Sequence, residues 1–319
     1  MLTRTLGRSG IEVSALGMGC WAVGGPFTKD GEPVGWGEVD DAESVRAIHK
    51  ALDLGVTLFD TSACYGCGHS ETILGKALGA RRGDVVIATK FGHVWEEGSK
   101  DMHAAEVTPG LVRTSCEESL RRLGTDVIDL FQFHQGGYDP GKAAVVRDAC
   151  GDLVREGKIR WYGWSTDSPE RARVFAEGTH CAAIQQQLNI LEGNLETLAL
   201  CEALGLASIN RGPLCRGLLT GKFDHDSALP ANDVRHDWDF RHGKQAEWLD
   251  TLEQIRGVLT REGHTLAQAA IAWLWARSDA TIPIPGFKTV AQVTENVAAL
   301  DRGPLSDEQM AEIDRLASG

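Results

Sequence analysis

The chain has no excess of basic residues, and this argues against nucleic acid as a partner. Its 319 residues include 32 lysines and arginines against 45 aspartates and glutamates, so the formal net charge is −13. We also find no basic run with interleaved aromatic side chains, the usual electrostatic signature of a nucleic-acid binder. The sequence therefore predicts small molecules, rather than nucleic acids, as partners.

Long apolar runs are also missing. No stretch reaches the length of about 18 apolar residues that a helix needs to span a bilayer, and Met1 to Arg8 contain no apolar core of a signal peptide. The 8 cysteines are scattered through apolar segments, which suits free thiols in a reducing compartment better than a disulfide framework. We therefore expect a cytoplasmic protein with no membrane partner.

The common nucleotide and metal motifs are absent as well. The nearest approach to a dinucleotide-binding fingerprint is Gly17-Met18-Gly19-Cys20-Trp21-Ala22, which runs into Gly24-Gly25-Pro26 instead of opening a helix. There is no Walker A sequence and no His-Glu-x-x-His helix. If a nucleotide binds, another part of the fold must hold it.

Short apolar runs recur along the whole chain, each followed by an amphipathic segment. The runs are mostly continuous rather than alternating, as expected for parallel strands that are covered on both faces. Eight strand–helix alternations favour an α/β fold, a closed (β/α)8 TIM barrel spanning residues 1–319 as one domain, with an open doubly wound sheet as the alternative. The runs lie near 15–21, 56–61, 85–91, 127–133, 159–164, 182–187, 206–211 and 280–285.

Local signals refine this fold. We expect a helix from Ala42 to Leu52, capped by Asp40 or Asp41, and another that begins at Thr108-Pro109. Two short extended segments flanking residues 7–10 predict an N-terminal β-hairpin that plugs the barrel floor. Loops after barrel strands belong to the active-site face, and the loops expected there lie near 22–37, 92–106 and 215–245.

Titratable side chains end or follow three of the predicted strands. Asp60 stands at the end of the second run and Tyr65 follows it, Lys90 stands at the end of the third, and His134 follows the fourth. Each residue by itself has an ordinary structural explanation, such as a cap, a half-buried aromatic side chain or an interior histidine. Because the carboxyl ends of barrel strands meet on one face, the four together predict a catalytic site.

This pattern resembles a known family. Asp60-Thr61-Ser62, Tyr65-Gly66, Ser70-Glu71, Lys90 and His134 are similar to the catalytic pattern of the aldo/keto reductases. The resemblance implies an NADP-dependent oxidoreductase that transfers a hydride between nicotinamide and an aldehyde, ketone or sugar. It continues along nearly the whole chain, through Gly163-Trp164-Ser165, Gln185 to Asn189, Pro213-Leu214, Gly217 to Lys222, and Gly286-Phe287-Lys288-Thr289 with Gln292, Glu295 and Asn296.

The chemistry of carbonyl reduction explains the four side chains. A proton donor must lie near the oxygen on which negative charge develops, and Tyr65 can supply that proton. A phenol has a pKa of about 10, and the ammonium of Lys90 is expected to lower it by favouring the phenolate. Asp60 would hold Lys90 charged and in place, and His134 would orient the substrate oxygen; the family assigns the same roles.

Cofactor contacts follow from the same resemblance. Ser165 and Gln185 match the ligands of the nicotinamide carboxamide, although Thr166 stands where Asn is common. Arg211 stands where an aromatic ring often stacks on the nicotinamide, and a planar guanidinium also stacks. The remaining residues that the resemblance assigns to the cofactor are Trp21, Asp60, Pro213, Leu214, Gly217 and Gly286.

The adenosine end of the cofactor is expected beyond the eighth strand. Lys288 and Thr289 stand at a helix start, where positive charge, a hydroxyl and free backbone N–H groups suit a phosphate. The family places the adenosine 2′-phosphate there, which favours NADP, with NAD as the alternative. Gln292 replaces a common Arg and removes one cationic contact, and Asn296 matches the adenine ligand.

Two further features concern the substrate and metals. Four tryptophans fall in expected loops (Trp21, Trp36, Trp95 and Trp238), and of these we predict that Trp21 and Trp95 contact the substrate. Cys64-Tyr65-Gly66-Cys67 with His69 mimics a zinc or redox motif, but it lacks further ligands and the appropriate fold context. The sequence therefore predicts no metal site.

Two other functions remain open from the sequence. The chain could be a regulatory barrel that binds NADP without turnover, although the four catalytic residues are all present. It could instead be an enzyme that forms a Schiff base on Lys90, but this leaves the phosphate motif near Lys288 unexplained. The sequence indicates neither the direction of a reaction nor an oligomeric state.

Overall fold

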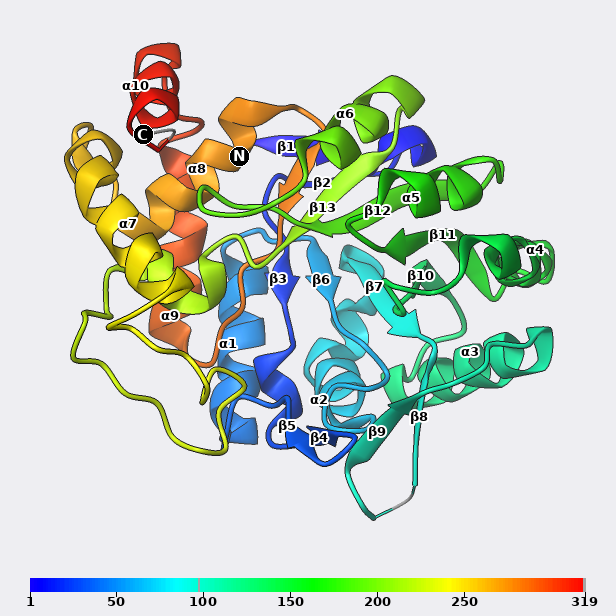
Figure 1. Ribbon diagram of the computed structural model, residues 1–319. Helices are drawn as coiled ribbons and strands as arrows, with labels where there is room; N and C mark the ends of the chain where they lie inside the picture. The colour runs from blue at the N-terminus through cyan, green and yellow to red at the C-terminus, as the bar shows by residue number, and fades with distance from the viewer. Residues whose placement is uncertain (97, 318–319) are drawn as a thin grey trace.

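The computed structural model describes residues 1–96 and 98–317. Within this part of the chain, eight parallel strands form one sheet in the order β14-β13-β12-β11-β10-β7-β6-β3, and helices surround it (Figure 1). The strands are β3 (Met18–Gly19), β6 (Leu58–Asp60), β7 (Val86–Phe91), β10 (Ile128–Phe133), β11 (Ile159–Ser165), β12 (Cys181–Gln187), β13 (Ala207–Arg211) and β14 (Thr281–Pro283).

The two ends of this sheet meet. A parallel bridge joins Gly19 to Gly286, and the Gly19 N–H donates to the carbonyl of Pro285 at 3.0 Å. A Cβ on Gly19 would lie 2.7 Å from the carbonyl oxygen of Ile284, so this seam requires a residue without a side chain. Each strand falls on one of the eight apolar runs. The prediction of a barrel over an open sheet is therefore confirmed.

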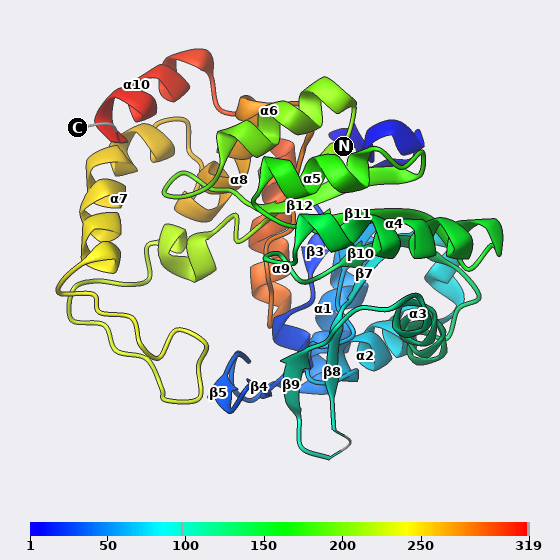
Figure 2. The same ribbon diagram turned by 45° about the vertical axis from the view of Figure 1, so that its right-hand side comes forward.

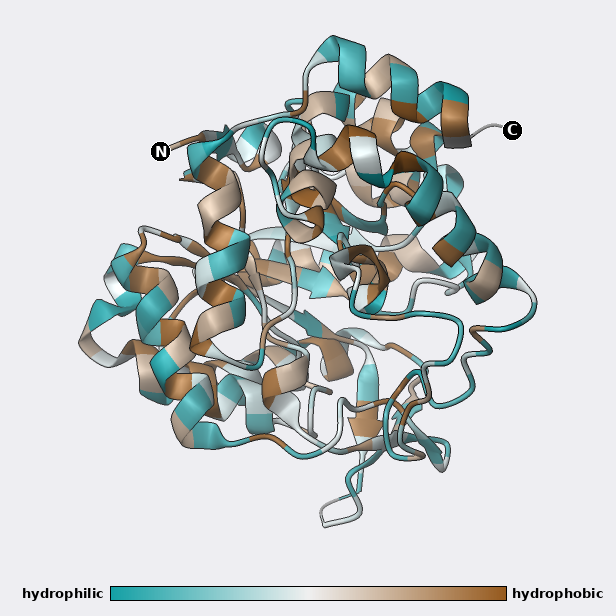
Figure 3. Ribbon diagram, turned by 90° about the vertical axis from the view of Figure 1, so that its left-hand side faces the viewer, coloured by the Kyte–Doolittle hydropathy of each residue, from teal (hydrophilic) through white to brown (hydrophobic). Residues whose placement is uncertain are grey.

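The helices pack on the outside of the barrel with their apolar sides inward (Figures 2 and 3). The predicted caps are confirmed: the Asp40 side chain accepts from the Ala42 N–H, and the Thr108 side chain accepts from the Leu111 N–H. Among the described residues, no helix is long and apolar enough to cross a membrane. The helices are α1 (Asp41–Asp53), α2 (His69–Leu78), α3 (Pro109–Leu123), α4 (Pro140–Arg155), α5 (Pro169–Ala176), α6 (Leu195–Leu204), α7 (Lys244–Thr260), α8 (Leu266–Arg277), α9 (Val290–Val297) and α10 (Asp307–Ala317).

The amino-terminal segment forms the expected hairpin. β1 (Thr3–Thr5) pairs antiparallel with β2 (Glu12–Ser14). Leu6 is fully buried and packs with the side chains that fill the barrel interior. A Cβ on Gly7, whose φ is +49°, would lie 2.1 Å from the carbonyl oxygen of Ala182. The hairpin thus lies in direct backbone contact with β12.

The segments expected as active-site loops follow β3, β7 and β13. The first two contain a small sheet in the order β5-β4-β9-β8, built from β4 (Thr28–Lys29), β5 (Glu32–Pro33), β8 (His93–Trp95) and β9 (Asp101–Ala104); residue 97 lies outside the described residues. The sequence analysis did not predict these strands, because strands this short show no periodicity. The third begins with a 3₁₀ segment, Cys215–Thr220. All three gather at one end of the barrel (Figure 1).

Truncation of Leu6 tests how much the hairpin contributes to the fold. Leu6→Ala leaves a cavity at the barrel interior, so we expect the free energy of unfolding to fall by about 2–5 kcal/mol. Leu195→Ala, at a residue that is 53% exposed, is the matched control and should change it by about 0.5 kcal/mol or less. Urea unfolding of both variants gives the comparison, and equal losses would contradict the hairpin's structural role.

Candidate active site

The site is built around a buried lysine. Lys90 in β7 is fully buried, and its ammonium donates to Asp60 Oδ1 at 2.5 Å and to the carbonyl of Thr61 at 2.7 Å. It also lies 3.3 Å from the hydroxyl of Tyr65. β6 and β7 are hydrogen-bonded neighbours, and this pairing brings Asp60 beside Lys90. The sequence-predicted residues Asp60, Lys90 and Tyr65 are therefore in contact.

The second oxygen of Asp60 has its own donors. Oδ2 accepts from Gln132 Nε2 at 3.0 Å and from Gln185 Nε2 at 2.8 Å. Both glutamines are buried in barrel strands, β10 and β12. The sequence analysis missed Gln132, although a glutamine inside the apolar run Leu130–Phe133 is the signal that marks it. The carboxylate is thus satisfied by buried partners alone.

Close backbone packing and aromatic contacts fix the position of Tyr65. Its ring stacks on Trp21, with the centroids 6.0 Å apart, and meets His134 edge-on. The next residue, Gly66, has a φ of +60°, and a Cβ there would lie 2.0 Å from the carbonyl oxygen of Gly24. The turn that carries Tyr65 therefore fits only with glycine at both positions of this contact, since a Cβ on Gly24 would also lie 2.7 Å from the Tyr65 backbone.

Burial and charge compete at Tyr65. Burial raises the pKa of Tyr65 to about 12, and the nearby Lys90 ammonium opposes this without reversing it. The expectation of a lowered pKa is thus wrong in sign, because desolvation of the phenolate outweighs the cation. Burial lowers the pKa of Lys90, but Asp60 and Tyr65 counteract it, and the net pKa lies above the ordinary value. At neutral pH the phenol holds its proton and Lys90 is charged.

His134 lies beside Tyr65. Its Nδ1 is 3.1 Å from Ser62 Oγ and 3.4 Å from Cys64 Sγ. Burial holds the pKa of His134 well below its usual value, and His93 and Lys90 act in the same direction. The imidazole is therefore neutral, so one ring nitrogen carries a proton and the other accepts.

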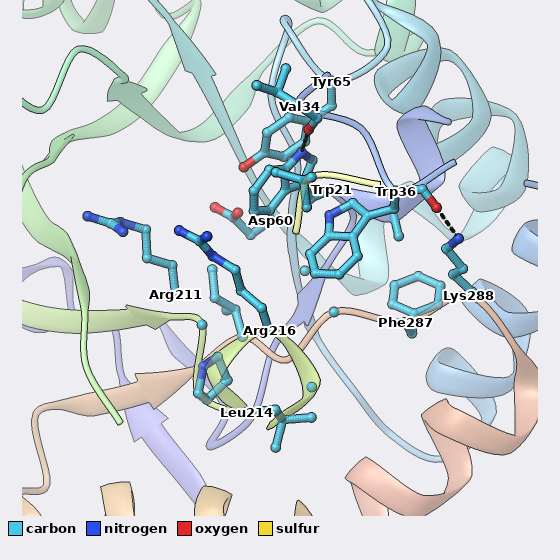
Figure 4. A pocket seen from close by; sticks show the side chains of 18 of the residues that line it. Trp21, Val34, Trp36, Asp60, Tyr65, Arg211, Leu214, Arg216, Phe287 and Lys288 are labelled. Atoms are coloured by element: carbon cyan, nitrogen blue, oxygen red, sulfur yellow. Dashed lines mark hydrogen bonds between the residues drawn. The ribbon is translucent and has the colours of Figure 1, made fainter. Parts of the chain in front are cut away.

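A cavity of about 670 Å³ opens over these side chains (Figure 4). Asp60, Tyr65 and His134 line it, whereas Lys90 lies beneath. Trp21 lines it as well, held by a hydrogen bond from its Nε1 to the carbonyl of Val34. Of the other residues expected to bind the cofactor, the cavity wall contains Ser165, Gln185, Arg211, Pro213, Leu214, Gly217, Gly286, Lys288, Gln292 and Asn296.

Two predicted residues take other positions. Within the described residues, neither Thr289 nor Trp95 lines the cavity. The Thr289 side chain caps α9, accepting from the Gln292 N–H, and the Trp95 ring lies 5.5 Å from the guanidinium of Arg122. Trp36 lines the cavity instead, edge-on to Trp21. Trp95 packs against the buried cluster of Phe27, Cys64 and Met102, and its contact with a substrate stays a prediction.

Arg211 ends β13 at the cavity wall. Its guanidinium donates to Gln187 Oε1 at 3.0 Å and forms an ion pair with Asp167. These partners fix the position of the planar group. Farther along, Arg216 and Gly217 both have positive φ, 50° and 94°, so the chain kinks where it follows the cavity.

Backbone N–H groups at the start of α9 are already hydrogen-bonded to side chains. The Val290 N–H donates to Glu43 Oε1 at 2.9 Å, and the Lys288 N–H donates to Gln292 Oε1 at 2.7 Å. Lys288 Nζ donates to the carbonyl of Trp36 (Figure 4). The sequence analysis missed Glu43, which lies on α1. Two backbone donors expected to face a phosphate thus already have side-chain partners.

The histidine beside His134 makes stability depend on pH. Burial, aided by Lys29, lowers the pKa of His93 to about 4, whereas an unfolded chain binds that proton at about pH 6.5. Between these values the unfolded state holds more protons, so the free energy of unfolding falls with decreasing pH by up to about 1.4 kcal/mol per pH unit.

Replacement of His93 tests this linkage. We expect His93→Gln to remove that part of the slope when urea unfolding is measured from pH 7 to pH 4.5. His242→Gln, at an exposed histidine, is the control. A slope in the His93→Gln variant as steep as in the unaltered chain would contradict the assignment.

Comparison with known proteins places these features in a family. The family described as Aldo/keto reductase family matches residues 15–318. The chain is 32% identical to aldo-keto reductase YhdN of Bacillus subtilis, covering 97% of this chain and 91% of that protein. It is 31% identical to an NADH-specific methylglyoxal reductase of Escherichia coli, covering 93% and 92%.

Solved structures give the same result. A glycerol dehydrogenase, AKR11B4 from Gluconobacter oxydans, superposes with a TM-score of 0.87 at 32% identity, covering 99% of this chain and 95% of that one. An aldo-keto reductase from Klebsiella pneumoniae in complex with NADPH superposes with a TM-score of 0.72 at 27% identity, covering 99% and 96%. On this evidence the chain belongs to the aldo/keto reductase family.

Proposed function

We propose that this protein is an NADP-dependent oxidoreductase that transfers a hydride between nicotinamide and an aldehyde, ketone or sugar. The observation that carries the proposal is the contact of Lys90 with both Asp60 and Tyr65 at the base of a cavity. Family membership supports it, as does the binding of NADPH by the Klebsiella relative.

The cavity residues fit this cofactor. The cavity wall runs from Tyr65 and Ser165 to Asn296, so one continuous space joins the catalytic side chains to the start of α9. Cationic side chains on the wall suit the phosphates: Arg216, Lys222, Arg235 and Lys288. When bound, the cofactor supplies or accepts the hydride. We propose that Ser165 and Gln185 hold its carboxamide, and that Arg211 lies against the nicotinamide ring.

The protonation states favour reduction at neutral pH. Tyr65, whose pKa is raised to about 12, keeps the proton that a carbonyl oxygen needs as it becomes an alcohol. The phenolate that remains is stabilised by the Lys90 ammonium 3.3 Å away. The neutral imidazole of His134 donates a hydrogen bond to the same oxygen and orients it. Oxidation of an alcohol needs the phenolate at the start, so it is favoured by alkaline pH.

The wall around the reacting group suits small carbonyl compounds. Phe27, Cys64 and Met102 form a compact buried cluster, against which Trp21 and Tyr65 pack. Two relatives act on small substrates, as a methylglyoxal reductase and a glycerol dehydrogenase. We therefore place a short aldehyde or ketone, with Trp21 against it, at this end of the cavity.

Replacement of Tyr65 by Phe tests the central role directly. Loss of the proton donor should lower the rate of NADPH oxidation with methylglyoxal or glyceraldehyde by about 10²–10⁴-fold. The dissociation constant for NADPH, measured by fluorescence quenching, should stay within about twofold because the phenol makes no proposed cofactor contact. Tyr138→Phe is the matched control and should retain activity. An active Tyr65→Phe enzyme would contradict the proposed acid.

Other outcomes identify the alternatives. Tight NADPH binding without turnover of any carbonyl would indicate a regulatory barrel. Borohydride trapping of substrate on Lys90 would indicate a Schiff-base enzyme. The structure disfavours the second alternative, since a buried ammonium held by Asp60, with its pKa above the usual value, is a poor nucleophile.

We propose that NADP is accepted with only a modest preference over NAD. The Glu43 carboxylate lies at the first turn of α9 and would repel an adenosine 2′-phosphate placed there. Its pKa is lowered by the hydrogen bond from Val290 and by Arg46, so it is charged at neutral pH. Lys288 attracts the same phosphate. The two charges therefore oppose each other at this position.

Variants at the start of α9 should change this preference. Glu43→Gln removes the repulsion and Gln292→Arg adds a cationic contact, so each should tighten NADPH binding by about threefold or more while leaving NADH binding nearly unchanged. Fluorescence titration with both cofactors measures the ratio. Glu202→Gln removes the same charge from an exposed position and should leave the ratio unaltered. An unaltered ratio in Glu43→Gln would contradict the account.

We further propose that the chain is a single barrel domain whose floor is closed by the β1–β2 hairpin. The burial of Leu6 among the interior side chains supports this. So does the backbone contact of Gly7 with Ala182. A closed floor leaves the opposite end, where the loops gather, as the entrance to the cavity.

A further inference from the structure

Three potential metal ligands converge at the substrate end of the cavity. One thiol and two imidazoles, those of Cys64, His93 and His134, place ligand atoms within 4.8 Å of one another. The sulfur of Cys64 lies 3.4 Å from His134 Nδ1, and the rings of His93 and His134 are 5.2 Å apart and nearly perpendicular. The three residues come from separate elements: the turn after β6, strand β8 and the end of β10.

This set differs from the motif visible in the sequence. His69 lies with its Nε2 2.8 Å from Asp41 and is drawn away from Cys64. Cys67 is only partly buried, and the candidate ligand set contains neither Cys67 nor His69. The local spacing of Cys64, Cys67 and His69 thus gives the wrong partners for Cys64. His93 instead stands two residues beyond the end of β7, and its ring contacts that of His134.

The imidazoles are in the form that binds metals. His93 Nδ1 is buried and, within residues 1–96 and 98–317, has no hydrogen-bond partner. Burial lowers the pKa of both His93 and His134, so each has a free lone pair at neutral pH. All three side chains also line the cavity, so an ion and its water can reach them.

We propose that Cys64, His93 and His134 bind a zinc ion at the substrate end of the cavity. Zinc prefers sulfur and nitrogen ligands at about 2.3 and 2.0–2.1 Å in a tetrahedron, and such ligands lie about 3.3–3.7 Å apart. The 3.4 Å between Cys64 and His134 already matches this spacing. Magnesium and calcium prefer oxygen ligands, and the set contains none.

Binding exchanges a proton for the metal. The Cys64 thiol, whose pKa burial raises to about 11, loses its proton to solvent as the sulfur–zinc bond forms, and no electron is transferred. The resulting thiolate offsets part of the positive charge of the ion. The cations Lys90 and Arg211, which act on His134, repel the ion. Three protein ligands leave one tetrahedral position open toward the cavity.

One consequence rests on the proposed function. Zinc held by Cys64, His93 and Nδ1 of His134 occupies the space that we assign to the substrate, because all three residues line that end of the cavity. Zinc should therefore inhibit carbonyl reduction in competition with the carbonyl compound, and a chelator should reverse the inhibition. The cofactor contacts lie on other elements, so NADPH binding should be unaffected.

Cobalt substitution tests the site without any activity measurement. Cobalt(II) titrated into the full chain should bind in a 1:1 ratio, giving the visible bands of a tetrahedral ion and a thiolate-to-cobalt charge-transfer band that added zinc abolishes. Cys64→Ser should lose the charge-transfer band, and His93→Gln should weaken cobalt binding at least tenfold. Cys67→Ser, which changes a cysteine three residues after Cys64 and outside the proposed set, is the matched control and should bind as the unaltered chain does.

The outcomes separate the site from the function. A charge-transfer band that persists in Cys64→Ser, that is lost in Cys67→Ser, or that never forms would overturn the site. In the activity assay, zinc should inhibit the unaltered enzyme at least ten times more strongly than it inhibits Cys64→Ser. If the cobalt spectra are as predicted but the protein reduces no carbonyl compound, the metal site is supported and the proposed function is contradicted.

Discussion

The buried ion pair between Lys90 and Asp60 is the interaction on which the rest of the site depends. Moving two charges out of water costs several kcal/mol per ion, and their attraction offsets this only when the remaining hydrogen-bonding groups are also satisfied. Here the lysine also contacts the Thr61 carbonyl and Tyr65, and Gln132 and Gln185 satisfy the carboxylate. The hydrogen bonds of this pair thereby connect β6, β7, β10 and β12.

The same pair explains the chemistry proposed for Tyr65. Burial alone disfavours formation of the phenolate. The ammonium next to it provides the charge that stabilises the phenolate once the proton has left. Asp60 prevents that ammonium from losing its own proton. The barrel shields the lysine from solvent, because Lys90 lies below the cavity surface, whereas the phenol of Tyr65 and the imidazole of His134 line the cavity.

The sequence predicts the barrel and the four central residues because both leave local signals. Each strand is an apolar run, and Asp60, Lys90 and His134 each stand at or just beyond the end of such a run. Other features depend on contacts between distant segments. The hydrogen bond from Val290 to Glu43 joins residues 247 positions apart, and the small sheet that contains His93 has strands too short to show a period. The sign of the Tyr65 pKa shift likewise depends on burial.

A double-mutant cycle on the ion pair tests the account most directly. Lys90→Met leaves an unpaired buried carboxylate and Asp60→Asn leaves an unpaired buried ammonium, so each should lower the free energy of unfolding by about 3–5 kcal/mol. The double variant removes both charges, so its loss should fall short of the sum of the single losses by about 2 kcal/mol or more. Urea unfolding of the four proteins at pH 7 gives these values. Losses that simply add would contradict the claim that this pair organises the site.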